Sequence, residues 1–233
     1  MDFPASLCYN TKEYGFSNAE RRSNVLIKRL AEGFIGANCY LLISDGHAMI
    51  VDPCARTEIM TTAVEQEGLI LDGILLTHGH FDHIMSLDGL LQKYPVPVYL
   101  GAGDRDFPSD SKKNAFSLFF GCERTFPEAT DLLKDDDLLF LGGEEIRVIA
   151  TPGHSGGSCC FYIREKNGES ILLTGDTLFA DCTGRTDLYG GSEEILQDSL
   201  AALLTLSRRD NSIVIYPGHG ESELLTVALR AVL

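Results

Sequence analysis

Short apolar runs recur along this chain, each bounded by glycine, proline or charged residues. Their shortness and their content of Val, Ile, Leu, Phe and Tyr predict β-strands. In the first half these strands are residues 25–30, 39–44, 48–52, 73–77 and 96–101. In the second half they are residues 137–143, 145–151, 158–165 and 169–176, with a last strand and loop in 211–220. Asp45-Gly46 joins two of the early strands and is typical of a hairpin turn.

Longer segments with helical spacing of apolar residues lie between and after these strands. The predicted helices are residues 57–68, 83–94, 112–121, 192–206 and 221–232. Thr57 is a candidate N-cap and Gly68 a candidate stop for the first helix. Ser192, followed by two acidic residues, is the predicted N-cap of the fourth helix.

The alternation of strands and helices, with hairpins at the start of each half, predicts an α/β fold. We expect two sheets packed face to face with helices outside. Residues 1–24 are polar and without pattern, which predicts a loosely attached leader. No linker rich in Gly, Pro or Ser divides the remainder, so residues 25–233 are predicted to form one domain.

Composition narrows the class of protein. The 233 residues are 44% hydrophobic, yet no apolar run approaches the roughly 18 residues of a membrane span. The N-terminal residues lack the apolar run of a signal peptide. Seven cysteines, an odd number without CxxC spacing, fit a reducing compartment better than a disulfide framework. We therefore expect a cytoplasmic protein without membrane contact.

The net charge of −15 argues against a nucleic-acid partner, because phosphate backbones repel an acidic chain. A local basic patch would be needed, and the longest basic clusters are pairs such as Arg21-Arg22 and Arg208-Arg209. We expect instead a small-molecule substrate.

Three of the six histidines fall within the stretch LLTHGHFDHIM, residues 75–85. His78 and His80 follow a predicted strand, and alternate residues of an extended segment point the same way. The chain then turns into a helix, which brings Asp82 and His83 towards a second point nearby. Four ligand side chains in six residues can therefore serve two adjacent metal ions.

Three further candidate ligands also end predicted strands. They are His154, Asp176 and His219, and a glycine precedes each of them. Imidazole and carboxylate ligands suit Zn, Fe or Mn, whereas closed structural zinc sites are usually rich in cysteine thiolates. The sequence thus predicts a catalytic metal site. His47, in the predicted hairpin turn, is expected to be solvent-exposed.

The motifs THGHFDH, PGHSGGS, LLTGDTLF and YPGHG, in this order, resemble those of the metallo-β-lactamase superfamily. The resemblance runs from about Val25 to the C-terminus. It implies a four-layer αββα hydrolase with two divalent metal ions, most commonly zinc. The implied ligands of the first ion are His78, His80 and His154, those of the second are Asp82, His83 and His219, and Asp176 bridges the two.

A narrower resemblance lies in GDTLFADCTGRTDLYGGS, residues 175–192, and in NCYLL, residues 38–42. Both are similar to glyoxalase II-like proteins, the hydroxyacylglutathione hydrolases, and the first also to persulfide dioxygenases. Glyoxalase II has an additional helical region that helps hold glutathione. Only fourteen residues follow His219 here, so the match is to the short, single-domain glyoxalase II-like hydrolases.

The resemblance implies a thioester or ester hydrolase in which a hydroxide bridging the two ions is the nucleophile. Asp82 and Asp176 are then catalytic as well as metal-binding, with Asp82 orienting the hydroxide. One alternative is a persulfide dioxygenase that holds a single iron through His78, His154 and Asp176. An RNA-processing zinc nuclease and a purely structural zinc protein are the remaining alternatives, the former disfavoured by the charge of −15.

Arg185 is the predicted substrate-binding residue. It follows Asp176 by nine residues in a glycine-flanked loop, and the resemblance implies that a basic residue there contacts an acidic part of a thiol substrate. An ion pair with Asp187 that only stabilises the loop is the alternative for the same arginine. Cys54 and Cys182 are candidates to line the pocket, although buried structural cysteine is the more common case.

Overall fold

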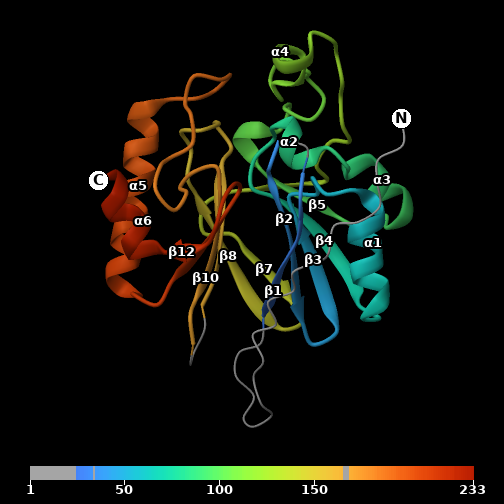
Figure 1. Ribbon diagram of the computed structural model, residues 1–233, viewed down its shortest axis with the longest axis horizontal. Coiled ribbons are helices and arrows are strands. Elements are labelled where there is room, and N and C mark those ends of the chain that lie inside the picture. The colour runs from blue at the N-terminus through green and yellow to red at the C-terminus, as the bar shows by residue number, and fades with distance from the viewer. Residues whose placement is uncertain (1–24, 34, 165–167) are drawn as a thin grey trace.

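Two six-stranded sheets packed face to face form the centre of the structure, a computed structural model that describes residues 25–33, 35–164 and 168–233 (Figure 1). The leader expected over residues 1–24 lies outside the described residues. The first sheet has the order β1-β2-β3-β4-β5-β6. Its strands are β1 (Leu26–Glu32), β2 (Asn38–Ser44), β3 (His47–Val51), β4 (Ile70–Leu76), β5 (Val98–Gly101) and β6 (Asp131–Leu133). The first three pair antiparallel, and β3 to β6 run parallel.

The second sheet has the order β12-β11-β10-β9-β8-β7. Its strands are β7 (Leu138–Leu141), β8 (Glu144–Ala150), β9 (Cys159–Ile163), β10 (Ile171–Gly175), β11 (Val214–Pro217) and β12 (Glu223–Leu224). Only β10 and β11 pair in parallel. Both sheets are therefore mixed.

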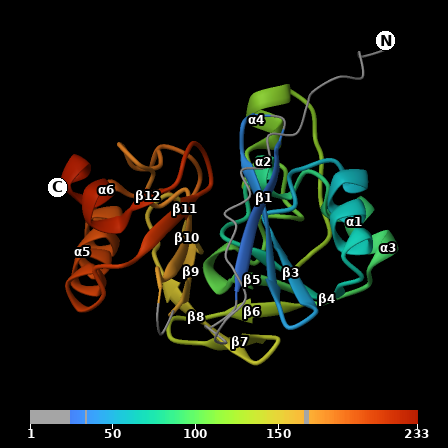
Figure 2. The same cartoon turned by 60° about the horizontal axis from the view of Figure 1, so that its bottom comes forward.

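Helices cover the outer face of each sheet (Figure 2). Helices α1 (Thr57–Gln66), α2 (Phe81–Ile84) and α3 (Leu87–Lys93) pack on the first sheet. Helices α5 (Glu193–Arg209) and α6 (Leu225–Val232) pack on the second. Between β5 and β6 lie a 3-10 turn (Ala102–Asp104) and α4 (Phe116–Phe120). The predicted α/β fold of two sheets with helices outside is confirmed. No described helix is long and apolar enough to cross a membrane.

The core between the sheets is built from alternate residues of facing strands. Leu42, Val51 and Leu75 point inward from the first sheet, and Phe161 and Leu173 from the second. All five side chains are essentially inaccessible to solvent. Since the remaining faces of both sheets bury other side chains against helices, the strands read as continuous apolar runs.

Several local predictions are confirmed. Asp45 and Gly46 form the hairpin turn, with φ of 49° and 80°. Gly68 follows α1 with φ of 62°, a conformation that glycine adopts without steric cost. Ser192 caps α5, because its side chain accepts a hydrogen bond from the backbone of Ile195.

Other local predictions are wrong. Thr57 does not cap α1 but is its first residue, and Arg56 occupies the cap position without a side-chain hydrogen bond. The single helix expected over residues 83–94 is two helices, interrupted at Met85 and Ser86. The expected helix over residues 112–121 is reduced to α4, because Ala115 adopts φ of 66°.

The short edge strands β6 and β12 were not expected. Each has at most three residues, and only one of those, Leu133, is buried. A strand this short and exposed carries almost no periodic signal in the sequence.

Strand direction determines where a site can form. The parallel strands β3, β4 and β5 end at one edge of the first sheet. In the second sheet β8, β10 and β11 all run in one direction, because β9 is antiparallel to both β8 and β10. Every ligand predicted from the sequence follows one of the strands β4, β8, β10 or β11, so the topology gathers them at one mouth of the sandwich.

The cap of α5 yields a test of stability. Ser192→Ala should lower the free energy of unfolding by about 0.5–2 kcal/mol, because the amide of Ile195 loses its acceptor. Urea denaturation at matched metal content measures this. Ser222→Ala is the control, since this exposed side chain makes no hydrogen bond within the described residues. Equal effects of the two substitutions would contradict the assigned cap.

Candidate metal centre

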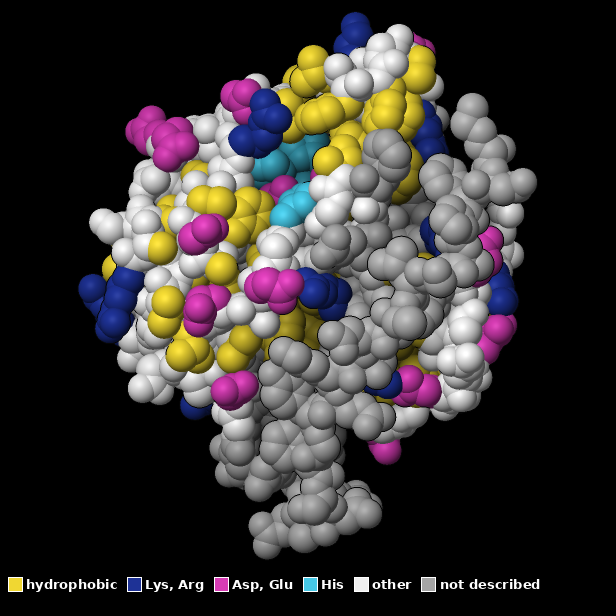
Figure 3. All heavy atoms as spheres, viewed as in Figure 1, with side chains coloured by type: hydrophobic (Ala, Val, Ile, Leu, Met, Phe, Trp, Pro, Cys, Tyr) yellow, Lys and Arg dark blue, Asp and Glu magenta, His cyan; other side chains and the backbone are white. Residues whose placement is uncertain are grey.

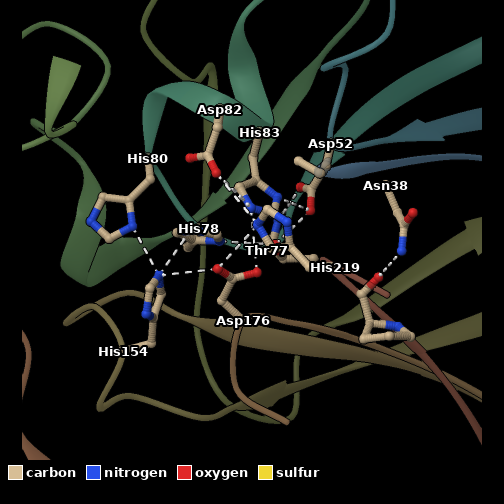
Figure 4. Close-up of polar contacts among 12 residues, drawn as sticks. Asn38, Asp52, Thr77, His78, His80, Asp82, His83, His154, Asp176 and His219 are labelled. Atoms are coloured by element: carbon tan, nitrogen blue, oxygen red, sulfur yellow. Dashed lines mark hydrogen bonds and ion pairs between the residues drawn. The ribbon is translucent and has the colours of Figure 1, made fainter. Parts of the chain in front are cut away.

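All seven predicted ligands lie together at the mouth of the sandwich (Figure 4). They are His78 and His80 after β4, Asp82 and His83 in α2, His154 after β8, Asp176 after β10, and His219 after β11. Figure 3 shows histidine and acidic side chains at the bottom of a hollow that hydrophobic side chains border on one side. The cluster is thus open to a molecule arriving from solvent.

Three imidazoles form the first group. His80 Nδ1 lies 2.9 Å from His154 Nε2, which in turn lies 3.2 Å from His78 Nε2. All three residues are buried. The nitrogens thus converge on a single point, as ligands of one ion would.

The second group lies on the other side of Asp176. His219 Nε2 is 3.4 Å from Asp82 Oδ2, and His83 Nε2 is 3.7 Å from the same oxygen. Asp176 Oδ1 lies 3.3 Å from His83 Nε2, while its Oδ2 lies 3.6 Å from both His154 Nε2 and His219 Nε2. Its carboxylate therefore faces both groups, which is the position expected of a bridging ligand.

Hydrogen bonds fix which nitrogen of each ring is protonated. His154 Nδ1 donates to the carbonyl of Arg185 at 2.7 Å, and His83 Nδ1 donates to Asp52 Oδ2 at 2.9 Å. Thr77 donates its own hydroxyl proton to Asp52, so it accepts from His78 Nδ1 at 3.1 Å. In each case Nε2 is the nitrogen that faces the centre of the cluster, where it can offer its lone pair to an ion once it is deprotonated.

Burial and neighbouring charges divide the histidines by pKa. Burial, with His154 beside it, lowers the pKa of His80 to about 3, and burial together with His83 lowers that of His78 well below its usual value. Burial alone would lower the pKa of His83, but the carboxylates of Asp176, Asp82 and Asp52 raise it well above the usual value. His78 and His80 are therefore neutral at pH 7, whereas His83 carries a proton that an ion would displace.

The carboxylates respond in the opposite direction. Burial would raise the pKa of Asp176 and of Asp82, but His83 next to both lowers it below the usual value. Both groups are thus ionised at neutral pH and can act as ligands.

The donor set fits divalent ions. His83 Nε2 and Asp176 Oδ1 are buried and, apart from their 3.3 Å contact with each other, make no hydrogen bond to any described residue. Such groups are costly to bury unless a partner satisfies them. Imidazole nitrogens on one tetrahedral Zn²⁺ at about 2.0–2.1 Å lie roughly 3.3–3.4 Å apart, close to the separations found in the first group. Nitrogen and oxygen donors of this kind suit Zn, Fe or Mn.

Asp52 is a functional residue that the sequence analysis missed. It follows β3, is buried, and accepts hydrogen bonds from the Thr77 amide at 2.8 Å, the Thr77 hydroxyl at 2.7 Å and His83 Nδ1. It therefore orients His83 directly and His78 through Thr77. Its position at the end of an apolar strand was the available signal, as for the ligands themselves.

Asp104 was also missed. It is completely buried and accepts hydrogen bonds from the amides of Gly79 and Gly157 and from the Ser155 hydroxyl, at 2.7–2.9 Å. Gly79 lies between His78 and His80, whereas Ser155 follows His154. Asp104 therefore ties together the two loops that supply the first group.

The loop carrying His219 is held from β2. The side-chain amide of Asn38 donates to the carbonyls of Pro217 and Gly220 at 3.0 and 2.9 Å, and the Tyr40 hydroxyl donates to Pro217 at 2.8 Å. The segment NCYLL thus positions a ligand from the opposite sheet.

The Arg185 loop touches the centre through its backbone. Its carbonyl holds His154, and a Cβ at Gly184 would lie 1.8 Å from the carbonyl oxygen of Asp176, so only glycine fits there. The Arg185 side chain forms a two-point ion pair with Asp187, at 2.6 and 2.7 Å, and is half exposed. The expected loop-stabilising pair is therefore present, and substrate binding by Arg185 stays a prediction.

Three other expectations concern residues near the site. His47 is not in the hairpin turn but begins β3, and its half-exposed ring pairs with Asp72 at 2.9 Å. Cys54 is buried and donates to the carbonyl of Ala37 at 3.1 Å, which fits the structural alternative. Cys182 is exposed.

The Asp52 contacts predict an effect on metal affinity. Asp52→Ala leaves His83 and Thr77 without their acceptor, so affinity for Zn²⁺ should fall about 10- to 100-fold. Competition with a chelating dye measures this, and circular dichroism checks that the variant folds. Asp72→Ala removes a similar histidine partner outside the centre and should leave affinity unchanged. Equal affinities for both variants would refute the orienting role of Asp52.

The opposite pKa shifts of the histidines predict how each ring titrates. In metal-free protein, NMR should show His83 and His219 titrating above their usual pKa of about 6.5, and His78 and His80 below it. Since a ligand must lose its proton, affinity for the metal should also fall as the pH drops through the raised values. Similar pKa values near 6.5 for all four rings would contradict the account.

Comparison with known proteins agrees with this geometry. A probable metallo-hydrolase of Bacillus subtilis (strain 168), YqgX, is 37% identical over 201 residues, covering 85% of this chain and 92% of the relative. The crystal structure of the BLEG-1 B3 metallo-beta-lactamase superposes with a TM-score of 0.79 at 33% identity, covering 88% of this chain and 97% of that one. The crystal structure of TTHA1623 in a di-iron-bound form superposes with a TM-score of 0.73 at 29% identity, covering 88% of this chain and 98% of that one.

A family match covers the segment that contains every candidate ligand. Residues 33–219 match the metallo-beta-lactamase superfamily. The family, the two mixed sheets and the histidine cluster at their mouth agree with one another and with the order of motifs in the sequence. The chain belongs to the metallo-β-lactamase superfamily and is a metallo-hydrolase of that fold.

Proposed function

We propose that this protein is a binuclear metal-dependent hydrolase of thioesters or related esters, of the short glyoxalase II-like kind. One observation carries the proposal: Asp176 lies between two groups of donors, each with three further ligands. His78, His80 and His154 would hold one ion, and Asp82, His83 and His219 the other. Two divalent ions, when bound, supply Lewis acidity and lower the pKa of water to about 7.

Zinc is the metal we favour, because five imidazoles and two carboxylates match its preferences. Iron is a second candidate, supported by the di-iron form of TTHA1623, and Mn fits the same ligands.

Asp82 and Asp176 are the proposed catalytic carboxylates. Asp82 Oδ2 lies 3.4 Å from His219 Nε2, and its side chain is only partly buried, at 15% exposure. An oxygen in this place can accept a hydrogen bond from an attacking water. The hydrogen bond orients the water so that one of its lone pairs points towards the substrate. Asp176 faces donors of both groups and so fixes the position of one group relative to the other. Both roles need ionised carboxylates, which agrees with the lowered pKa of each.

The surroundings favour a leaving group that needs no proton. The other carboxylates next to the ligands, Asp52 and Asp104, are buried and occupied by hydrogen bonds to backbone and hydroxyl donors. Neither is available as a general acid. A thiolate is a weak enough base to leave unprotonated, whereas an amine is not, so a thioester suits this site better than an amide.

Arg185 remains a candidate for the acidic part of the substrate. Its loop passes the centre, and a guanidinium can bind a carboxylate at two points. The proposed substrate is therefore a small anionic thioester, and the charge of −15 disfavours a nucleic acid.

Metal stoichiometry and activity together test the proposal. Purified protein should hold two ions per chain, measured by native mass spectrometry, and should hydrolyse a simple thioester. Asp176→Ala should lose both ions and nearly all activity, whereas Asp82→Ala should lose mainly one. Asp198→Ala, an exposed acid on α5, is the control and should retain both.

A different pattern would overturn the proposal. One ion per chain, unchanged in Asp82→Ala, together with oxygen uptake on glutathione persulfide, would instead indicate a mononuclear iron dioxygenase. Two ions with no hydrolysis of any thioester would refute the proposed substrate class while leaving the metal centre intact.

A further inference from the structure

A second hollow lies beside the metal centre and takes no part in holding its ligands. It has a volume of about 450 Å³, and its lining includes Arg105, Phe107, Lys113, Leu132 and Tyr189. This volume falls in the range of about 300–1,000 Å³ that small-molecule sites occupy. The hollow is large enough for the part of a substrate that does not react.

Aromatic contacts join this hollow to the first group of ligands. The Phe107 ring lies 5.7 Å from the ring of His80 and 5.9 Å from that of Tyr189, measured between centroids. Phe107 is buried, whereas Tyr189 is more than half exposed. Tyr189 also lies only four residues after Arg185, whose carbonyl holds His154. One side of the hollow, formed by Phe107, is therefore in contact with a predicted metal ligand, His80.

Asp104 fixes the position of this wall. It lies in the 3-10 turn directly before Arg105, and its carboxylate accepts hydrogen bonds from Gly79 and Gly157. A Cβ at Gly103 would lie 2.3 Å from the carbonyl of Gly156, so the two loops are in close contact. The hollow and the ligand loops consequently form one rigid unit, as a substrate subsite requires.

The charges in the hollow differ from those of the molecule as a whole. The chain has 34 acidic and 19 basic residues, yet two cations, Arg105 and Lys113, and only one acid, Asp106, line this hollow. Lys113 pairs with Asp106 at 3.2 Å and lies 5.5 Å from the centre of the Tyr189 ring. The Arg105 guanidinium makes no hydrogen bond or ion pair to any residue that the structure describes. Arg105 is thus the uncompensated positive charge.

We propose that this hollow is a subsite for an anionic group of the substrate, remote from the reacting carbonyl. The Arg105 guanidinium binds the anion, and Phe107 and Tyr189 pack against the segment that connects it to the carbonyl. The inference rests on the proposed thioester hydrolase, and it names a substrate class with a carboxylate or phosphate at the far end.

Arg105 suits this role better than Arg185. The Arg185 guanidinium is already engaged at two points by Asp187, so a substrate anion there must compete with an existing carboxylate. Arg105 has no such competitor among the described residues. In a chain of net charge −15, an anion also needs a local cation to approach at all.

Two matched thioesters test the subsite. They have the same length and differ only at the end remote from the reacting carbonyl, which bears a carboxylate in one and a carboxamide in the other. The ratio of their kcat/KM values measures recognition of the anion, and a third thioester with a terminal phosphate shows which anion is preferred. Wild-type protein should favour the anionic compounds by at least about tenfold, mainly through KM.

Four variants make the test specific. Arg105→Ala should bring the ratio close to one. Arg105→Lys should restore part of it, because lysine keeps the positive charge but cannot donate two parallel hydrogen bonds as a guanidinium does. Arg208→Ala, an exposed arginine at the end of α5, should keep the wild-type ratio. Arg185→Ala tests the other candidate cation, and it keeps most of the ratio if Arg105 is the residue that binds the anion. If Arg185→Ala abolishes the ratio and Arg105→Ala does not, the proposed subsite is wrong.

Binding of thioethers separates this inference from the proposed function. A thioether that replaces the reacting carbonyl by a methylene cannot be hydrolysed, and calorimetry measures its affinity directly. The carboxylate form should bind wild-type protein about tenfold more tightly than the carboxamide form, and Arg105→Ala should remove that difference. Absence of the difference in wild-type protein overturns the subsite. The difference without any thioester hydrolysis overturns the proposed function alone.

Discussion

Burial of ionisable groups at one edge of the sheets is the constraint on which this structure depends. Imidazoles and carboxylates that leave water lose much solvation free energy unless other groups compensate them. Here the compensation is built in two layers. The inner layer is the mutual approach of His83, Asp82 and Asp176, and the outer layer is the set of hydrogen bonds that Asp52 and Asp104 accept. The site therefore keeps its donors close together through the fold itself.

Sheet topology makes such a cluster possible. Strands β4, β8, β10 and β11 end at the same mouth, so a ligand directly after each strand reaches a common centre without long loops. The two sheets also hold each other's ligands. Asn38 and Tyr40 of the first sheet bind the loop that carries His219 of the second, and Arg185 after β10 binds His154 after β8. A change in the packing of the sheets would thus alter the spacing of the two groups of donors.

The sequence predicted the sandwich and all seven clustered side chains, because each ligand stands at the end of an apolar run. It did not predict Asp52 or Asp104, since a single acid after a strand or in a loop resembles any surface acid until its partners are seen. It also merged α2 and α3, whose interruption at Met85 and Ser86 leaves the apolar spacing almost unchanged. Arg185 illustrates a further limit: its place in a loop was evident, but its pairing with Asp187 depends on side-chain geometry.

X-ray absorption of protein loaded with two equivalents of zinc tests the central claim most directly, namely that these seven side chains hold two adjacent ions. The account predicts nitrogen and oxygen neighbours at about 2.0–2.1 Å, no sulfur near 2.3 Å, and a zinc–zinc contribution at about 3.5–4 Å. Sulfur neighbours would place zinc on the cysteines instead. Nitrogen and oxygen neighbours without any zinc–zinc contribution would show that the two groups of donors do not act together, and would contradict the binuclear account.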